Sequence, residues 1–367
     1  MPHAYHVGCL TAVASNMSSA VEKSLFGNIK LRTVEMHTAG EPFRIVVSGY
    51  PKFEGETILE KRRFAREKLD HLRKLLMFEP RGHHDMYGAI LVEPDLPGAD
   101  LAVLFTHNEG YSTMCGHGVI ALGRFAVDHG FVKPQQPETE VAVQCPCGLV
   151  RAFVEYNEER KKTGQVRFNS VPAFVFALDT EVQVEGYGSL KVDIAYGGAF
   201  YALISAHEFG LDVRRSCVKD IVNAATAVAS AIKAKVQIKH PDSEGSDLDF
   251  LYGVIVTDGQ DAWSDQPTAN ICVFADAAVD RSPTGSGVTA RVALQHAKGQ
   301  IALQQTRSFE SGLCGTVFTG KAIKMTKCGS VDAVIVEVSG RAHYTGEATY
   351  TIDEDDPVGS GFLLRYE

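Results

Sequence analysis

MCGHGVIALGRFAVDHG (residues 114–130) places a cysteine and a Gly-His-Gly turn directly before an apolar run at helical spacing. Gly130, followed shortly by Pro134, is a helix stop signal. Cys115 is therefore expected at or just before a helix N-terminus, where backbone N–H groups lack partners and the helix dipole is positive. Such a position favours a thiolate and can also hold a carboxylate. A buried, inert cysteine before a core helix is the alternative.

A second stretch, PTGSGVTARVALQHAKG (residues 283–299), repeats the first at a constant offset, with Thr284 lying 169 residues after Cys115. Both glycines of the turn and the glycine of the helix stop recur, and Ser286 falls opposite His117. A repeat with this spacing predicts two similar domains. Two helix N-termini facing one another across a cleft would offer four or more N–H donors to one anion. Chance similarity of glycine-rich turns is the alternative.

The flanking sequences extend both motifs and add others along the chain. They read EMHTAGEPFR (35–44), EPRGHHDMYGA (79–89), HNEGYSTMCGHG (107–118), CVFADAAVDRSPTGSG (272–287), GTVFTG (315–320) and GRAHYTGEATY (340–350). From about residue 30 to its C-terminus, the chain resembles the proline racemase family, which also contains hydroxyproline epimerases and trans-3-hydroxy-L-proline dehydratases. Racemases and epimerases of this family carry a cysteine where this chain has Thr284, so the departure resembles the dehydratase branch.

Many short strand-like segments with helices spaced among them predict α/β domains with mainly antiparallel sheets. The resemblance implies two pseudo-symmetric lobes of the proline racemase and diaminopimelate epimerase type, each a curled sheet around a central helix, with the active site in the cleft between them. We expect residues 29–182 to form the first lobe and 183–344 the second, with 345–367 returning to the first. Residues 1–28 lack the family motifs and are expected to be a poorly ordered extension.

The resemblance also implies roles for particular residues. Cys115 would be the catalytic base, and the backbone N–H groups of the two helix N-termini would bind the substrate carboxylate. Asp280 would bind the ring nitrogen of the substrate. Without the resemblance, Asp280 would be interpreted as a helix-entry cap or a turn residue, and His117 as a turn histidine. The substrate-binding set is therefore Gly116, His117, Asp280, Thr284, Gly285 and Ser286. His83 and His84 are left unassigned.

A single base limits the reaction. Racemisation needs one group on each face of the α-carbon, and a threonine hydroxyl is far less acidic than a thiol, whose pKa is about 8.5. One base suffices when the substrate carries a leaving group on the next carbon, as a 3-hydroxyproline does. The sequence thus favours a trans-3-hydroxy-L-proline dehydratase, a hydro-lyase. The alternatives are a proline racemase or hydroxyproline epimerase with an unrecognised second base, and a non-catalytic imino-acid-binding protein.

Length, composition and charge indicate which partners and which compartment to expect. The chain has 367 residues, of which 45% are hydrophobic, enough for the cores of two domains. A net charge of −9 argues against nucleic acid and against an anionic membrane surface. No apolar run approaches a membrane span, and the eight scattered cysteines indicate a reducing compartment, which we take to be the cytoplasm. We see no site for a pyridoxal or other cofactor, and leave a homodimer open.

One early segment is predicted in more detail because its pattern is pronounced. Residues 57–78 are expected to form a single helix with an apolar stripe. Its basic residues, which include Lys61, Arg62 and Lys74, are expected to form a solvated face.

Overall fold

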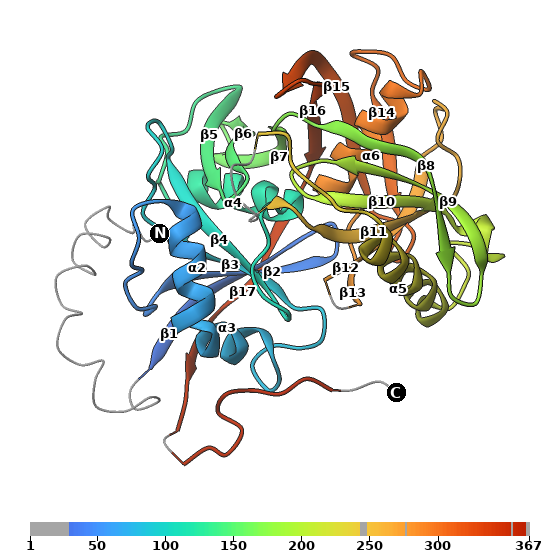
Figure 1. Ribbon diagram of the computed structural model, residues 1–367. Coiled ribbons are helices and arrows are strands. Elements are labelled where there is room, and N and C mark those ends of the chain that lie inside the picture. Colours follow the sequence, from blue (N-terminus) through green and yellow to red (C-terminus); the bar gives the residue numbers. More distant parts are fainter. Residues whose placement is uncertain (1–28, 243–247, 276, 354, 365–367) are drawn as a thin grey trace.

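The computed structural model describes residues 29–242, 248–275, 277–353 and 355–364, and the expected extension at 1–28 lies outside them. The described strands form one continuous sheet that curls into two lobes (Figure 1). Each lobe wraps around one buried helix, α4 (Gly116–Asp128) in the first lobe and α6 (Gly285–Ala297) in the second. The predicted fold class is confirmed.

The strands divide between the lobes. Those of the first lobe are β1 (Lys30–Thr38), β2 (Glu41–Ser48), β3 (Tyr87–Val92), β4 (Leu101–His107), β5 (Glu138–Cys145), β6 (Gly148–Asn157), β7 (Lys162–Asn169) and, from the C-terminal region, β17 (Ala342–Thr351). Those of the second are β8 (Phe174–Val184), β9 (Gly188–Tyr196), β10 (Phe200–Ser205), β11 (Leu251–Thr257), β12 (Thr268–Phe274), β13 (Ala278–Asp280), β14 (Arg307–Ser311), β15 (Val317–Cys328) and β16 (Val331–Gly340). The remaining helices are α2 (Ile58–Lys68), α3 (Asp70–Met77), the 3-10 turn η1 (Ala206–Phe209) and α5 (Val218–Lys235).

The two lobes repeat one topology. From β1 to β7, successive strands pair antiparallel, parallel, antiparallel, parallel, antiparallel and antiparallel. The same order of pairings runs through β9, β10, β11, β12, β14, β15 and β16. Parallel pairs need crossover connections, and α4 and α6 lie in equivalent crossovers. The repeat seen in the sequence at the two glycine-rich turns is therefore a repeat of whole lobes.

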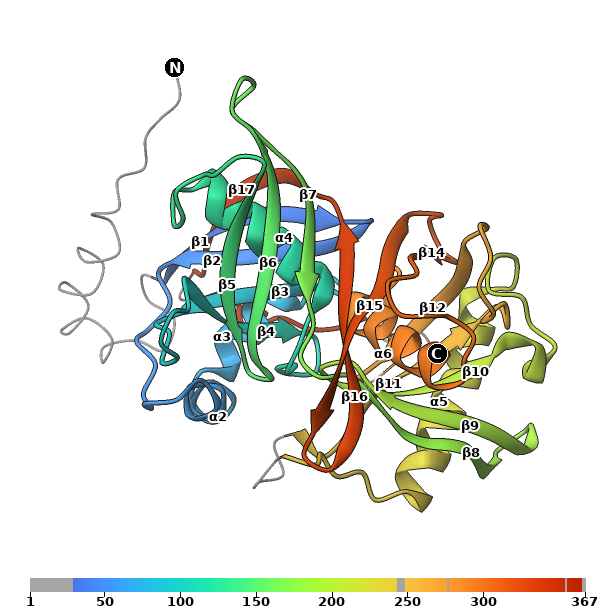
Figure 2. The same cartoon turned by 90° about the horizontal axis from the view of Figure 1, so that it is seen from above.

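The lobes are joined through their sheets. β7 pairs antiparallel with β16, and the C-terminal strand β17 returns to pair with β1 (Figure 2). β8 pairs antiparallel with β9, the position in the second lobe that corresponds to that of β17 beside β1. The division of the chain at residues 182 and 183 stays a prediction; that point falls within β8, near its end.

The central helices are surrounded by protein. α4 is apolar on nearly every side, which is the pattern of such a helix, whereas α6 buries Arg291 and Gln295, which both donate to the Asp261 carboxylate. Nearly every residue of α4 is buried, and it packs against β5, β6 and β7, while α6 packs against β15, β16 and the β8–β9 hairpin. Both helices end before a glycine with positive φ, Gly130 at 75° and Gly299 at 68°. The predicted start of the first helix at Cys115 and its stop at Gly130 are confirmed.

The single helix predicted for residues 57–78 is wrong. The structure has two helices, α2 and α3, separated at Leu69, where φ is −120° and ψ is 10°. The break turns Arg73 inward, and its guanidinium donates to the backbone carbonyls of His107 and Asn108 at the end of β4. Spacing alone cannot reveal this break, because the apolar stripe continues across it.

The basic residues of this segment are not all solvated. Lys74 is exposed as predicted, but Lys61 and Arg62 are buried. The Lys61 ammonium donates to the carbonyl of Glu93 at 2.8 Å, and Arg62 donates to that of Tyr111 at 2.6 Å. Long basic side chains can lie along apolar surface and pair with carbonyls that would otherwise lack donors.

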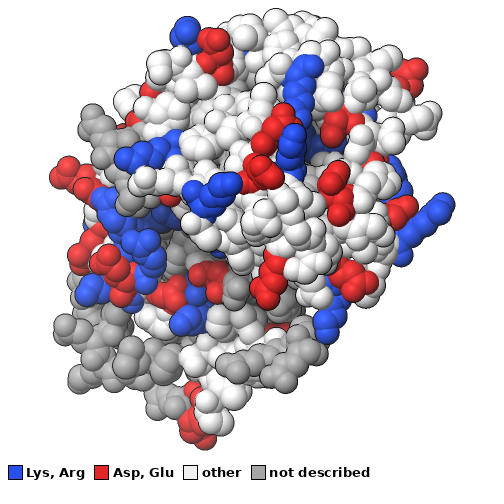
Figure 3. All heavy atoms as spheres, turned by 45° about the vertical axis from the view of Figure 1, so that its right-hand side comes forward, with Lys and Arg blue, Asp and Glu red and all other residues white. Residues whose placement is uncertain are grey.

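The surface carries charge of both signs. On the face in Figure 3, acidic and basic side chains are interspersed among neutral ones. Among the described helices, none combines the length and apolar character needed to cross a membrane.

The N-termini of α4 and α6 touch through their backbones at the centre of the molecule. A Cβ placed on Gly116 would lie 2.4 Å from the Cα of Gly285, and one on Gly285 would lie 2.5 Å from the Cα of Gly116. Each position must therefore be a glycine, because the backbone of the other helix occupies the space that a Cβ would need. Any side chain at either position must push the two helix ends apart.

We therefore expect Gly116→Ala and Gly285→Ala each to lower the free energy of unfolding by about 1–3 kcal/mol, the usual cost of overpacking a core. Gly346→Ala is the matched control, because a Cβ on Gly346 meets nothing within 4 Å. Urea unfolding of the three variants measures the effect. Equal midpoints for all three would show that the helix ends separate without cost.

Candidate active site

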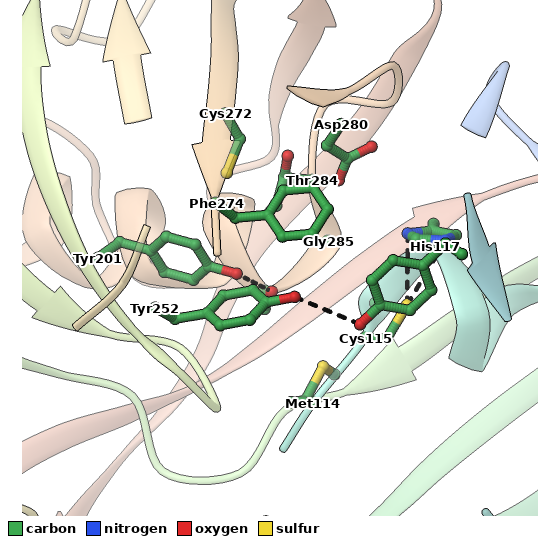
Figure 4. Close-up of a pocket in the computed structure, with 13 residues that line it drawn as sticks. Met114, Cys115, His117, Tyr201, Tyr252, Cys272, Phe274, Asp280, Thr284 and Gly285 are labelled. Carbon is green, nitrogen blue, oxygen red and sulfur yellow. Dashed lines mark hydrogen bonds between the residues drawn. The ribbon is translucent and has the colours of Figure 1, made fainter. Parts of the chain in front are cut away.

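A small pocket lies where the two helix N-termini meet (Figure 4). It is lined by Tyr87, Met114, Cys115, Gly116, His117, Tyr201, Tyr252, Cys272, Phe274, Asp280, Thr284, Gly285 and Ser286. All seven site residues predicted from the sequence are in this set. The structure therefore brings them together, from both lobes, around one space.

The backbone of both helix N-termini offers hydrogen-bond donors. Within the described chain, the N–H groups of Gly116, His117, Gly285 and Ser286 have no protein acceptor. The first N–H groups of a helix have no partner inside it, and the helix dipole adds positive potential at the same point. Two such ends in contact make a place suited to a carboxylate.

Cys115 is the N-cap residue of α4. Its sulfur accepts the Gly118 N–H at 3.2 Å and lies 3.3 Å from Nδ1 of His117. Burial raises the pKa of the Cys115 thiol well above its ordinary value and outweighs the lowering by the Gly118 N–H. The negative charge of Asp280 raises this pKa further. The expectation that the helix terminus alone would favour a thiolate is thus corrected for the unliganded protein.

His117 supplies no positive charge beside this thiol. Burial lowers the pKa of the imidazole to about 4, although Asp280 acts in the opposite direction. The ring is therefore neutral at neutral pH. Its edge packs on Phe43 and Tyr87, with ring centroids 5.6 and 4.9 Å away, and the Thr38 hydroxyl donates to its backbone carbonyl.

Thr284 occupies the N-cap position of α6, as Cys115 does that of α4, but with a different conformation. Its φ is 67°, a sterically costly value for a β-branched residue, whereas φ of Cys115 is −142°. Its side chain caps no backbone N–H, and within the described chain its buried hydroxyl oxygen has no hydrogen-bond partner. The mirrored positions are occupied by residues in different conformations.

Asp280 lies at the end of β13 and is held by contacts between the lobes. Its carboxylate accepts the Ser282 N–H at 2.8 Å. The next residue, Arg281, donates its backbone N–H to the Glu41 carboxyl at 2.6 Å, and its guanidinium donates to the carbonyl of Asp85 at 2.8 Å. Glu41 and Asp85 belong to the first lobe, so these contacts fix the Asp280 segment against the opposite lobe.

Glu41 is a further acidic group at this contact. It is fully buried, and burial raises the pKa of its carboxyl well above the ordinary value, as does the charge of Asp280. These effects outweigh the opposing effect of Arg281 on this pKa. The sequence motif around it was noted, but no feature of that motif distinguishes Glu41 from a surface residue.

Sequence reasoning also missed most of the pocket wall. Tyr87, Tyr201, Tyr252 and Phe274 line it, and the Tyr201 hydroxyl lies 2.7 Å from the Ser286 hydroxyl. Cys272, which lies in a quoted motif, is a second buried thiol in the pocket. In Figure 4 it lies on the side of Asp280 and Thr284, and burial raises the pKa of its thiol well above the ordinary value. A Tyr-Gly pair occurs at residues 87–88 and 252–253, but also at 187–188 and 196–197, so it does not distinguish the pocket tyrosines.

The two unassigned histidines lie outside the pocket lining. His84 contacts the Asp85 carboxylate at 2.9 Å, and His83 contacts the carbonyl of His84 at 2.7 Å. The described residues contain no group of three or more histidine, cysteine or acidic side chains placed to hold a metal ion.

Two duplicated α/β lobes with a thiol at paired helix N-termini define the class of fold to which this protein belongs. Residues 33–363 match the proline racemase family model, and the chain belongs to that family. A trans-L-3-hydroxyproline dehydratase from Saccoglossus kowalevskii is 62% identical over 90% of this chain and 100% of its own. A 3-hydroxyproline 2-epimerase from Burkholderia multivorans is 47% identical, over 91% and 98%. The crystal structure of an Agrobacterium vitis hydroxyproline epimerase with bound trans-4-hydroxy-L-proline has a TM-score of 0.84 and 27% identity, over 92% and 95%.

The raised pKa of Cys115 gives a measurable pH dependence. We expect alkylation of Cys115 by iodoacetamide to be slow at pH 7 and to rise about tenfold per pH unit into the alkaline range, because only the thiolate reacts. Asp280→Asn should move the midpoint to lower pH by removing a negative charge. Peptide mass spectrometry resolves Cys115 from the exposed reference thiol Cys217. A plateau for Cys115 below pH 8 would mean that the unliganded protein already holds a thiolate.

Proposed function

We propose that this chain is a trans-3-hydroxy-L-proline dehydratase, a hydro-lyase that uses its own side chains and backbone to remove water and give pyrroline-2-carboxylate. The observation that carries the proposal is the pairing of one cysteine, Cys115, with a threonine, Thr284, at the mirrored helix terminus. The 62% identity to a trans-L-3-hydroxyproline dehydratase supports the same reaction.

The substrate carboxylate binds between the helix N-termini. The N–H groups of Gly116 and His117 approach it from one side, and those of Gly285 and Ser286 from the other. Charge grows on this carboxylate as the α-proton leaves, and donors aimed at developing charge are a large catalytic effect, each worth roughly 2.7–4 kcal/mol when removed. Asp280 binds the ring nitrogen and fixes the ring between the lobes.

Substrate binding also prepares the base. The pKa of Cys115 is raised by burial and then by the charge of Asp280. A protonated ring nitrogen paired with Asp280 cancels much of that charge, and the thiolate becomes easier to form. The thiol thus stays protonated until a cationic ring occupies the pocket.

Cys115 then takes the α-proton. Thr284 cannot return a proton to the opposite face as a second base would, because an aliphatic hydroxyl does not ionise in this range. The bond to the 3-hydroxyl breaks instead, and the enamine that results tautomerises to a cyclic imine. In trans-3-hydroxy-L-proline the hydroxyl and the α-hydrogen lie on the same face, so the elimination is syn and takes place on the Cys115 side.

One observation favours a second candidate function. Cys272 places another thiol in the pocket, on the second-lobe side, and the Burkholderia multivorans relative is an epimerase. An isomerase would use Cys272 to return a proton opposite Cys115. Burial and the charge of Asp280 raise the pKa of Cys272 well above its ordinary value, as they do that of Cys115. Cys272 is the weaker candidate because Thr284, and not Cys272, occupies the N-cap position of α6 that mirrors Cys115.

The same proposal covers the setting of the reaction. The described cysteines are all unpaired, which supports a reducing compartment, and we place the protein in the cytoplasm. Its partner is a small hydroxyproline rather than nucleic acid or a membrane, and a homodimer remains open.

The deciding assay is incubation of the purified protein with trans-3-hydroxy-L-proline and trapping of the imine with borohydride as proline. Wild type should consume substrate, and Cys115→Ser should lower the rate by at least about a hundredfold, because a serine hydroxyl cannot act as the base. Circular dichroism checks that the variant is folded. Turnover at the wild-type rate in Cys115→Ser would remove Cys115 from the mechanism, and a wild-type product that is only the 2-epimer would favour the isomerase.

Thr284→Cys should add a second base. The new thiol would stand at the N-cap of α6, opposite Cys115. The substitution also removes a β-branched side chain from a residue with φ of 67°. We expect this variant to convert L-proline, which lacks the leaving hydroxyl, into D-proline at a low but measurable rate. Chiral chromatography after long incubation compares it with wild type. A folded variant that binds L-proline yet makes no more D-proline than wild type would show that Thr284 is not the sole barrier to racemisation.

A further inference from the structure

Two tyrosines at equivalent positions of the lobes meet inside the pocket. Tyr87 begins β3 and Tyr252 lies at the start of β11, and each precedes a glycine in matching parallel pairings, Gly88 with β2 and Gly253 with β10. Their hydroxyl oxygens lie 3.4 Å apart, a contact drawn as a dashed line to Tyr252 in Figure 4. The lobes thus contribute one phenol each to a shared pair.

Packing fixes both phenols. The Tyr87 ring stacks on His107, with centroids 5.8 Å apart, and the Tyr252 ring stacks on Phe274 at 5.5 Å. Both tyrosines are buried. The Tyr87 hydroxyl is also hydrogen-bonded to the Ser112 hydroxyl. Two buried hydroxyl partners orient the phenol of Tyr87 without either of them carrying charge.

Tyr87 lies on the Cys115 side of the pocket. Both residues line the pocket, and both contact His117, whose ring centroid lies 4.9 Å from that of Tyr87 and whose Nδ1 lies 3.3 Å from the Cys115 sulfur. The Tyr87 hydroxyl also lowers the pKa of the Cys115 thiol. Burial raises the pKa of Tyr87 itself well above its ordinary value, with a further contribution from Cys115. Tyr87 is therefore a neutral hydrogen-bond donor throughout the physiological range.

We infer that Tyr87 is the acid of the dehydration, donating its hydroxyl proton to the departing 3-hydroxyl while Cys115 reprotonates it, with Tyr252 and Ser112 holding the phenol in place. This inference rests on the proposed function, and it assigns the one proton transfer that the proposal leaves open. It places leaving-group activation on the same face as proton abstraction.

The step balances. The Cys115 thiolate takes the α-proton, and the electron pair of that C–H bond becomes the new carbon–carbon double bond. The pair of the C3–O bond leaves with oxygen, which takes the Tyr87 proton. The Cys115 thiol then gives its proton to the Tyr87 oxygen. Water departs, and the thiolate and phenol are both restored.

Other hydroxyls are placed less well for this task. The Tyr201 hydroxyl is hydrogen-bonded to that of Ser286 at the N-terminus of α6, and Thr284 stands at the N-cap position of that same helix. Both therefore lie on the second-lobe side of a bound ring, whereas the hydroxyl of the trans substrate leaves on the first-lobe side with the α-proton. Direct transfer from the Cys115 thiol is the rival route, and it requires no tyrosine.

Tyr87→Phe tests the inference by separating proton abstraction from leaving-group departure. We expect it to slow dehydration of trans-3-hydroxy-L-proline by about a hundredfold or more, the usual range for loss of a general acid. Exchange of the α-hydrogen of L-proline in heavy water, followed by NMR, should fall by a much smaller factor, about tenfold or less, because there Tyr87 acts only by lowering the pKa of Cys115. Elimination of trans-3-chloro-L-proline, whose chloride leaves without a proton, should fall only by that same small factor.

Tyr111→Phe is the matched control. It removes a buried tyrosine hydroxyl, which donates to the Ala65 carbonyl at 3.3 Å outside the pocket, and it should leave all three rates unchanged. If Tyr87→Phe does not fold, Ser112→Ala removes the partner of the phenol while keeping its ring. It should slow dehydration selectively, by a smaller factor.

Two outcomes would overturn the inference. Wild-type dehydration rates in Tyr87→Phe would assign the proton to Cys115 itself. Equal losses of dehydration, exchange and chloride elimination would show that Tyr87 acts only by supporting Cys115. Absence of dehydration in the wild type, in contrast, would reject the proposed function.

Discussion

The backbone contact between Gly116 and Gly285 joins the positive ends of two helices at the centre of the molecule. Each end carries roughly half a positive charge, and both present only donors, so neither can satisfy the other. The contact is held by packing around it, since Val119, Ile120 and Leu122 of α4 are fully buried and each such side chain is worth about 1.5–3 kcal/mol. The fold thus holds together a group of N–H donors that the described chain does not satisfy.

Placing this site between two lobes makes its chemistry depend on both. Cys115 and the Glu41 carboxyl come from the first lobe, and Asp280 and Thr284 from the second. Arg281 is the link, because it bonds to Glu41 and Asp85 across the boundary and directly follows Asp280. Burial raises the pKa of the Glu41 carboxyl and that of the Cys115 thiol, and so disfavours negative charge on both groups at the boundary between the lobes.

Much of this architecture could be predicted from the sequence because short stretches of the chain indicate it. The helix from Gly116 to Asp128 shows its apolar residues, its turn and its stop within one stretch, and the recurrence of the turn at Gly285 indicates a second lobe. Tyr87 and Tyr252 were missed because they lie 165 residues apart, not 169, so one alignment offset cannot match both pairs. Glu41, Lys61 and the pKa of Cys115 depend on burial by distant segments, which no local pattern reports.

The duplicated scaffold is symmetric in its backbone and asymmetric in its chemistry. Cys115 has φ of −142° and accepts a helix N–H, whereas Thr284 has φ of 67° and caps nothing. The two tyrosines of the pair also differ in their surroundings. The hydroxyl of Tyr87 is hydrogen-bonded to that of Ser112, which belongs to the same lobe as Tyr87. A reaction that abstracts a proton and expels a group on one face of the substrate needs its reactive side chains on one lobe. A two-base isomerisation needs an ionisable side chain on each lobe. The side chains around the twofold arrangement, and not the arrangement itself, therefore decide which reaction the cleft performs.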